Sequence, residues 1–206
     1  MCLYAVTDSM WLNGRTLPEV VGEALEGGAT FIQIREKELS HEKFVKLAKE
    51  VKCVTDCYHV PYVVNDEVEI AKLIDADGVH IGQSDEKLTK VRQILGPDKI
   101  IGVSAQTVEQ ALEAERNGAD YLGVGSIFCT STKSDADDVS LETLSAICKA
   151  VSIPVVAIGG IHPGNILDLK GTGVNGIAVV SAIFAAKDIK AATKKLLVAA
   201  KQLEKE

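Results

Sequence analysis

Short apolar runs alternate along the chain with longer stretches in which apolar residues recur at helical spacing. Runs of this kind are typical of strands buried on both faces, and the amphipathic stretches between them are typical of crossover helices. The runs are Leu3 to Val6, Thr30 to Ile34, Tyr62 to Val64, Gly78 to Ile81, Ile100 to Val103, Tyr121 to Val124, Val155 to Ile158 and Gly176 to Val180. Eight such units predict an α/β fold, a (β/α)8 TIM barrel that forms one domain over residues 1–206.

The expected helices cover about 16–26, 40–56, 67–74, 86–95, 107–117, 140–150, 163–170 and 188–203. Ser40, Thr107 and Ser140 stand where N-caps are needed. Glycine-containing segments at 26–29, 116–120 and 170–173 are typical of turns that end a helix and lead into the next strand. We therefore expect these turns at the amino end of the barrel.

Polar residues follow most of the apolar runs, and in this fold the carboxyl ends of the strands meet at one mouth. The residues are Thr7, Asp8, Arg35 to Lys37, Asn65, Asp66, Gln83 to Asp85, Ser104, Gly125, Ser126, Gly159, Gly160 and Ser181. A long irregular stretch, Ser126 to Val139, follows the sixth run on the same side. Loops of that length in a compact domain usually cover a ligand.

Composition narrows the possible partners. Hydrophobic residues make up 47% of the chain and charged residues 25%, and no apolar run approaches the roughly 18 residues of a membrane span. The first residues enter a strand without a basic segment and a hydrophobic stretch before it, so we expect no secretory signal, a cytoplasmic location and no membrane partner. A net charge of -7 argues against general nucleic-acid binding, although a local basic cluster can still hold an anion.

The five cysteines form an odd set with no C-x-x-C pair, which favours reduced thiols over a disulfide framework or a zinc site. Cys53 and Cys57 lie four residues apart in a helical stretch and so share one face. We expect them to fill space.

Asp66 and Asp85 follow the third and fourth runs, so both carboxylates can face one point at the mouth. Two ionised carboxylates favour a cation between them, and oxygen ligands on a partly open site suit Mg²⁺, which takes further ligands from water and a substrate phosphate. The alternative is that each aspartate caps the helix that follows it. As a pair at the mouth, they favour the metal.

Gln33, Arg35 and Lys37 alternate after the second run, so their side chains share one side in extended geometry. A guanidinium and an ammonium together make an anion receiver. The alternative is that Glu36 and Glu38 neutralise the stretch and all these charges are solvated.

A second group of anion-binding residues follows the sixth, seventh and eighth runs. Thr130, Ser131, Thr132 and Lys133 can wrap an anion in the long loop, and barrels often bind phosphate with the backbone after strands seven and eight, here Gly159, Gly160, Val180 and Ser181. The alternatives are a solvated loop and tight turns. Two separate anion sites indicate two phosphorylated small-molecule substrates.

Eight stretches together resemble thiamine-phosphate synthases in order and spacing over nearly the whole chain. They are residues 4–8 (YAVTD), 33–37 (QIREK), 64–66 (VND), 78–85 (GVHIGQSD), 101–104 (IGVS), 130–133 (TSTK), 158–161 (IGGI) and 177–181 (IAVVS). The resemblance implies a transferase that joins 4-amino-5-hydroxymethyl-2-methylpyrimidine diphosphate to a thiazole phosphate, carboxylated or not. The products are thiamine phosphate and diphosphate, and the diphosphate leaves before the thiazole nitrogen attacks.

The resemblance also implies roles for individual residues. The pyrimidine diphosphate would be held by Gln33, Ile34, Arg35, Glu36, Lys37, Asn65, Ser104 and Lys133, of which Arg35, Lys37, Ser104 and Lys133 would be catalytic. The thiazole phosphate would be held by Thr130, Ser131, Thr132, Gly160, Val180 and Ser181, and Mg²⁺ by Asp66 and Asp85. His80 lies inside a strand, where we expect a packed, hydrogen-bonded histidine instead of a base.

Two other functions stay open at this point. A related barrel, the thiazole tautomerase, isomerises the thiazole without a pyrimidine partner and does not need the acidic and basic set. A phosphate-binding barrel without catalytic activity is the other, because Ser126 and Cys129 replace prolines common in the family, and Ser140 a glycine. The loss of two prolines raises the cost of ordering the loop. The oligomeric state is open too, and includes a homo-oligomer.

Overall fold

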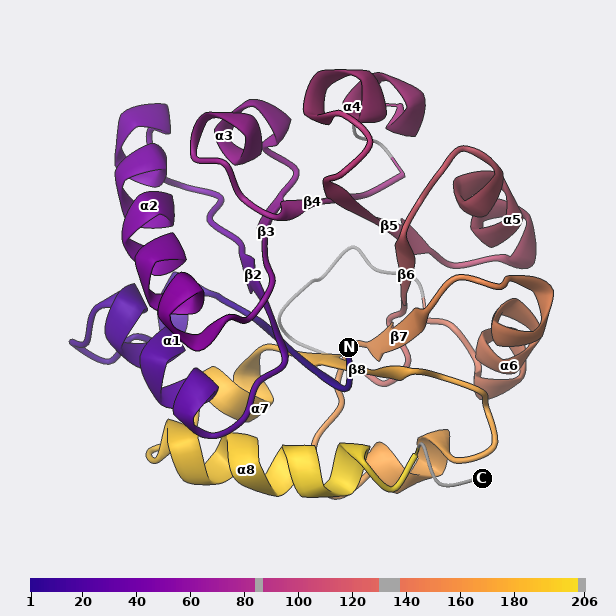
Figure 1. Ribbon diagram of the computed structural model, residues 1–206. Coiled ribbons are helices and arrows are strands. Elements are labelled where there is room, and N and C mark those ends of the chain that lie inside the picture. Colours follow the sequence, from indigo (N-terminus) through magenta and orange to yellow (C-terminus); the bar gives the residue numbers. More distant parts are fainter. Residues whose placement is uncertain (84–86, 130–137, 204–206) are drawn as a thin grey trace.

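A closed barrel of parallel strands forms the centre of the computed structural model, which describes residues 1–83, 87–129 and 138–203 (Figure 1). Each strand pairs with the next in sequence, and β8 pairs with β1 to close the ring. The strands are β1 (Leu3–Val6), β2 (Phe31–Ile34), β3 (Tyr62–Asn65), β4 (Gly78–Ile81), β5 (Ile100–Ala105), β6 (Tyr121–Val124), β7 (Val155–Ile158) and β8 (Gly176–Val179). The predicted (β/α)8 fold is confirmed.

Helices surround the strands as an outer ring (Figure 1). The α-helices are α1 (Leu17–Glu26), α2 (His41–Tyr58), α3 (Val68–Leu73), α4 (Leu88–Leu95), α5 (Val108–Arg116), α6 (Leu141–Ala150), α7 (Ser181–Phe184) and α8 (Ile189–Ala200). The described residues also form two 3₁₀ helices, η1 (Ser9–Trp11) and η2 (Ile166–Leu169). Within the described part of the chain, no helix combines the length and the apolar character needed to cross a bilayer.

The structure corrects the expected helix at 163–170. Only one 3₁₀ turn, η2, forms there, because Pro163 and Gly164 are poor helix residues and the Asn165 side chain bonds the backbone of His162 and Gly160. After β8, the short helix α7 precedes α8 and was not expected. The fifth strand is also longer than expected, so Ser104 lies within β5 and not after it.

Side-chain caps begin several of the helices. The hydroxyls of Thr107 and Ser140 accept hydrogen bonds from the third residue of α5 and α6, as expected. Thr16 and Glu19 form a reciprocal capping box at α1. Ser40 is the N-cap of α2, but its side chain makes no cap hydrogen bond.

The cysteines of α2 do not fill space in the core, which corrects the expectation. This helix buries Phe44, Ala48, Val51 and Thr55, a stripe at helical spacing. Cys53 and Cys57 lie outside that stripe and are exposed. All five cysteines are free thiols, as expected.

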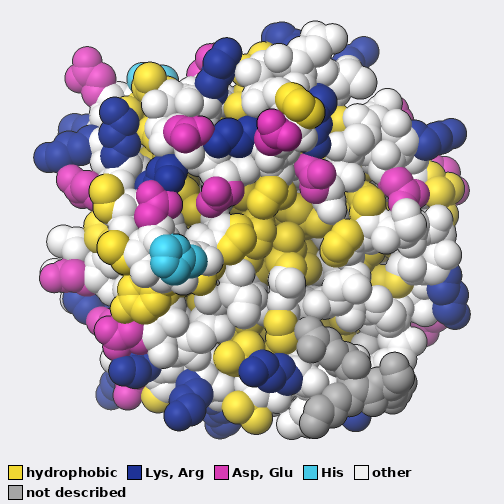
Figure 2. Space-filling view, viewed as in Figure 1, with side chains coloured by type: hydrophobic (Ala, Val, Ile, Leu, Met, Phe, Trp, Pro, Cys, Tyr) yellow, Lys and Arg dark blue, Asp and Glu magenta, His cyan; other side chains and the backbone are white. Residues whose placement is uncertain are grey.

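Two apolar layers hold the barrel together, because successive residues of a strand point to opposite faces. Leu3 and Ala5 of β1 join the large cluster between strands and helices, whereas Tyr4 and Val6 point inward. The inner cluster consists of Tyr4, Val6, Phe31, Val63, Tyr121, Val156 and Ala178. Figure 2 shows hydrophobic side chains gathered at the centre of one face, with charged side chains mostly around them. The barrel is therefore a packed core and not a pore.

Glycines let the inner rings approach the strands. A Cβ atom on Gly102 of β5 would lie 2.0 Å from Cζ of Tyr121, and one on Gly123 of β6 would lie 3.0 Å from Cε1 of His80. The rings of Tyr121 and His80 thus occupy space that any larger residue would take.

Gly102→Ala should lower the free energy of unfolding by about 1–3 kcal/mol, because the added methyl overpacks a buried ring. Gly22→Ala is the control: its Cβ would meet only Val54 Cγ1, at 3.8 Å, and α1 should gain about 0.5–1 kcal/mol. Urea unfolding of both variants measures the difference. A midpoint for Gly102→Ala equal to that of the parent chain would show that the ring can move at no cost.

Candidate active site

A cavity of about 460 Å³ opens at the carboxyl ends of the barrel strands. Its lining includes many of the predicted site residues: Gln33, Arg35, Lys37, Asn65, Asp66, Ser104, Gly160, Val180 and Ser181. These residues come from loops and strands distributed around the ring, from β2 to β8. The topology therefore brings them to one place, as the order of the strands predicts.

Other predicted residues do not line the cavity or lie outside the described residues. The side chain of Ile34 is buried in the layer between strands and helices, and Glu36 binds the Ser9 hydroxyl instead of lining the cavity. Asp85, Thr130, Ser131, Thr132 and Lys133 lie outside the described residues.

The loop after β2 is tied to the loop after β1. Thr7 accepts a hydrogen bond from the backbone N–H of Arg35 at 3.1 Å, and the Arg35 guanidinium lies 3.5 Å from an Asp8 carboxylate oxygen. The two charged side chains are only 17% and 18% exposed, so this ion pair is not a solvated surface contact. Arg35 is held at the cavity wall, and the alternative in which this stretch is merely solvated does not apply to it.

Glu36 adds a second tie to the β1 loop through Ser9. Burial raises the pKa of the Glu36 carboxyl, and the neighbouring Asp8 carboxylate adds to the rise, whereas the Ser9 hydrogen bond and Arg35 oppose it. Alternate residues of this stretch thus have different roles. Arg35 and Lys37 line the cavity, and Glu36 fixes the loop that carries them.

The acidic side of the cavity is formed by Asn65, the last residue of β3, and Asp66. The Asn65 amide donates to the Asp66 carboxylate at 2.6 Å, and Asp66 takes a left-handed backbone conformation with φ of 61°. The N-cap of α3 is Glu67, without a side-chain cap bond, so Asp66 does not cap the helix. Asp66 lines the cavity instead.

The described residues include no group of three histidine, cysteine, aspartate or glutamate side chains placed to share a metal ion. Asp85, the second predicted ligand, is outside that set. The Asp66 carboxylate and the Asn65 amide thus belong to the lining of the same cavity as Arg35 and Lys37.

The opposite side of the cavity is made mainly of backbone. Gly159 and Gly160 have φ values of 100° and 61°, and a Cβ on Gly160 would lie 2.6 Å from the carbonyl oxygens of Phe128 and Cys129. Glycine is required here because the loop after β6 packs directly on this turn. The next strand ends at Val179, and α7 begins at Ser181 beside the same cavity.

Ser126 occupies a position where the resembled family commonly has proline. Its hydroxyl donates to the Phe128 carbonyl at 2.9 Å, and its carbonyl accepts from the N–H of Val139 at 2.7 Å. The second of these hydrogen bonds connects Ser126 with Val139 across the segment between the two residues. Ser126 thus supplies a local restraint in place of the proline ring.

The floor of the cavity contains residues that the sequence prediction did not include in the site. Tyr4, His80 and Tyr121 are buried inside the barrel, and a chain of hydrogen bonds joins them to Gln33 and Ser104. The expectation of a packed, hydrogen-bonded His80 is confirmed. The sequence does carry a signal for this network: Tyr4, His80 and Tyr121 place polar atoms inside apolar strands. Buried polar atoms need hydrogen-bond partners.

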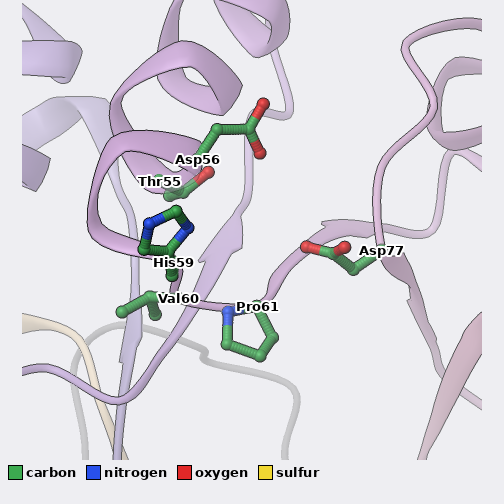
Figure 3. A pocket seen from close by; sticks show the side chains of 6 residues that line it. All are labelled: Thr55, Asp56, His59, Val60, Pro61 and Asp77. Carbon is green, nitrogen blue, oxygen red and sulfur yellow. The ribbon is translucent and has the colours of Figure 1, made fainter.

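A second cavity, of about 490 Å³, lies at the amino end of the strands and is lined by Thr55, Asp56, His59, Val60, Pro61 and Asp77 (Figure 3). Its carboxylates already have partners. Asp56 pairs with Lys52 at 2.8 Å, and Asp77 accepts the N–H of Tyr62 at 2.8 Å. The first contact lies within α2, and the second ties the start of β3 to the residue before β4, so we assign this hollow to the framework of the barrel.

Comparisons with known proteins agree with this geometry. Residues 3–183 match the family model described as thiamine monophosphate synthase. The chain is 54% identical over 195 residues to a thiamine-phosphate synthase of Ruminiclostridium cellulolyticum, covering 95% of this chain and 93% of that one. It is 52% identical over 194 residues to a thiamine-phosphate synthase of Clostridium tetani, covering 94% and 93%.

Solved structures show the same similarity. The thiamine phosphate pyrophosphorylase of Pyrococcus furiosus superposes with a TM-score of 0.91 at 42% identity, over 98% of this chain and 96% of that one. A 3-hexulose-6-phosphate synthase, at 20% identity and a TM-score of 0.67, covers 97% and 99% and shares the fold.

Glu36→Gln should change stability in a pH-dependent way. The folded chain raises the pKa of this carboxyl, so its stabilising contribution is complete below the unfolded value of about 4.3 and is lost as pH rises through the folded value. A neutral glutamine avoids that loss. Relative to the parent chain, the variant should gain unfolding free energy as pH rises above the unfolded value, measured by urea unfolding.

Glu19→Gln is a control of opposite sign. Hydrogen bonds from the backbone and side chain of Thr16 lower the pKa of Glu19, so its contribution is present above the unfolded value and is lost as pH falls through the folded value. This variant should therefore be less stable than the parent chain near neutral pH and approach it in acid. The same slope for both variants would contradict the assignment of Glu36.

Proposed function

The chain belongs to the thiamine monophosphate synthase family, and from this we propose that it joins 4-amino-5-hydroxymethyl-2-methylpyrimidine diphosphate to a thiazole phosphate. The products are thiamine phosphate and diphosphate. The observation that carries the proposal is the gathering of a basic wall, an acidic corner and a glycine-rich backbone turn around one cavity. Identity above 50% to two synthases over nearly the full chain supports the same activity.

The basic wall suits the diphosphate. Arg35 and Lys37 both line the cavity, and Arg35 is fixed by Asp8 and Thr7 before any ligand arrives. Departure of diphosphate concentrates negative charge on the leaving oxygens, and preorganised cations stabilise that charge without further rearrangement. We assign to Arg35 and Lys37 the stabilisation of the leaving group.

The backbone turn suits the phosphate of the thiazole. Gly159 and Gly160 have no side chains to shield their backbone, and Ser181 opens the short helix α7 beside them. Backbone N–H groups at such a turn bind phosphate well. Two anions would then be held on opposite sides of a cavity that positions the reacting groups between them.

Mg²⁺ is the cofactor that we propose for the acidic corner. The Asp66 carboxylate and the Asn65 amide offer oxygen ligands, and the cavity beside them leaves room for waters and phosphate oxygens, as Mg²⁺ requires. Asp85 is the proposed second carboxylate. When bound, the ion would help to neutralise the diphosphate. Asp66 and Asp85 would hold it, and Arg35 and Lys37 would hold the rest of the anion.

An assay with purified chain tests the function directly. Given both substrates and Mg²⁺, the protein should form thiamine phosphate and an equal amount of diphosphate. Isomerisation of the thiazole phosphate without release of diphosphate would show a tautomerase instead. Binding of the phosphorylated compounds without any product would show a barrel that binds but does not catalyse.

Asp66→Ala should reduce Mg²⁺-dependent turnover by about a hundredfold, the effect of removing one group that stabilises transition-state charge. Titration of Mg²⁺ against the initial rate should also show weaker activation. Asp98→Ala is the matched control, because Asp98 is an exposed aspartate in the turn before β5 at the amino end of the barrel. Equal Mg²⁺ dependence in the two variants would exclude Asp66 from the metal site.

A further inference from the structure

A continuous chain of hydrogen bonds crosses the barrel interior beneath the cavity. The Gln33 amide Nε2 donates to the Tyr4 hydroxyl, which lies 2.9 Å from the Tyr121 hydroxyl. The Tyr121 hydroxyl lies 2.9 Å from Nδ1 of His80, and Nε2 of His80 lies 3.0 Å from Oγ of Ser104. The two ends, Gln33 and Ser104, line the cavity from β2 and β5.

The middle of this chain is shielded from water. Tyr4 and Tyr121 are each 1% exposed and His80 is 9% exposed. Burial raises the pKa of both tyrosines well above the ordinary value, so each keeps its single hydroxyl proton. A phenol buried this deeply must place that proton on a neighbouring acceptor.

Counting protons fixes the direction of the chain. The Gln33 amide nitrogen can only donate, so the Tyr4 oxygen accepts from it and the Tyr4 proton goes to Tyr121. Tyr121 in turn donates to Nδ1 of His80. A neutral imidazole that accepts at Nδ1 carries its proton at Nε2 and donates it to the Ser104 oxygen. Each link then contains one proton, and the Ser104 proton remains for an acceptor in the cavity.

We propose that Tyr121 and Tyr4 are positioning residues that set the tautomer of His80 and thereby turn the Ser104 hydroxyl into a hydrogen-bond donor toward the substrate. Neither tyrosine needs to contact the reacting atoms. This inference rests on the proposed function, in which Ser104 faces the pyrimidine diphosphate. A donor held in one orientation stabilises growing anionic charge without reorganising.

The rest of the barrel supports this role. Gly102 leaves space for the Tyr121 ring and Gly123 for the His80 ring, so both rings approach the strands closely. The rings of Phe31 and Tyr4 pack edge-on against each other, with centroids 4.6 Å apart, and the centroids of Phe31 and Tyr121 lie 5.6 Å apart. The positions of the two hydroxyls are therefore fixed by packing as well as by their hydrogen bonds.

Tyr121→Phe tests the proposal because it removes two links and keeps the ring. We expect kcat to fall about tenfold, the effect of one hydrogen bond of ordinary strength lost in the transition state, with KM for both substrates within about twofold of the parent value. Tyr62→Phe is the matched control. Tyr62 is also fully buried, but its hydroxyl donates to the Ala48 carbonyl of α2, on the other side of the sheet.

Tyr121→Phe breaks two buried hydrogen bonds and Tyr62→Phe breaks one, so both variants should lose thermal stability, whereas only Tyr121→Phe should lose kcat. A folded Tyr121→Phe protein with the parent kcat would overturn the proposal. So would an equal fall in kcat for Tyr62→Phe, because the effect would then follow general destabilisation.

Nitrogen NMR of the ¹⁵N-histidine-labelled chain tests the direction of the chain without substrate or activity. His80 is assigned by loss of its signals in His80→Asn. We expect the proton on Nε2 in the parent chain, and loss of this single-tautomer preference in Tyr121→Phe. A proton on Nδ1 of His80 in the parent chain would overturn the proposal. If the parent chain makes no thiamine phosphate, the proposed function fails, and the NMR result still decides whether the hydrogen bonds have this direction.

Discussion

Closure of the barrel between β8 and β1 is the constraint on which the site depends. Residues Leu3, Tyr4 and Ala5 pair with Ile177, Ala178 and Val179, so the first and the last strand of the barrel lie next to each other. Without that pairing the eight strand ends would spread along an open sheet edge. With it, the basic loop after β2 and the glycine turn after β7 face one cavity from different sides. In the proposed function, this arrangement lets one cavity hold both anions at the same time.

The cavity combines a rigid floor with walls built from loops. The floor is the inner layer of the barrel, where aromatic rings pack against strand glycines. The walls are loops that bond to one another, as Asp8 and Ser9 bond to Arg35 and Glu36. The Arg35 guanidinium, held in this way at the wall, can bind an anion although the whole chain carries a net charge of -7. Local placement and not total charge decides what this site attracts.

The sequence was sufficient to predict the fold and most of the described cavity wall. Apolar runs mark buried strands, and their order places Arg35, Asp66, Ser104 and Gly160 at one mouth, as the structure shows. Ile34 was misplaced because adjacent strand residues face opposite sides, and a motif read as a continuous stretch ignores that alternation. The helix expected at 163–170 was wrong because side-chain bonds from Asn165 compete with helical ones. The floor network was missed because its members lie far apart in sequence and meet only when the barrel closes.

The contacts around Ser126 and Cys129, where the resembled family commonly has proline, belong to the same geometry. A proline restrains a loop through its ring, and it also removes a backbone donor. Ser126 restrains its loop through a hydrogen bond to Phe128 and a backbone contact from Val139, and packing of Phe128 and Cys129 on Gly160 adds a further restraint. At position 126 the restraint of a proline ring is thus replaced by several weaker contacts, of which the packing of Phe128 and Cys129 depends on the glycine turn. The start of the loop after β6, at Phe128 and Cys129, and the glycine turn after β7 therefore constrain each other's shape.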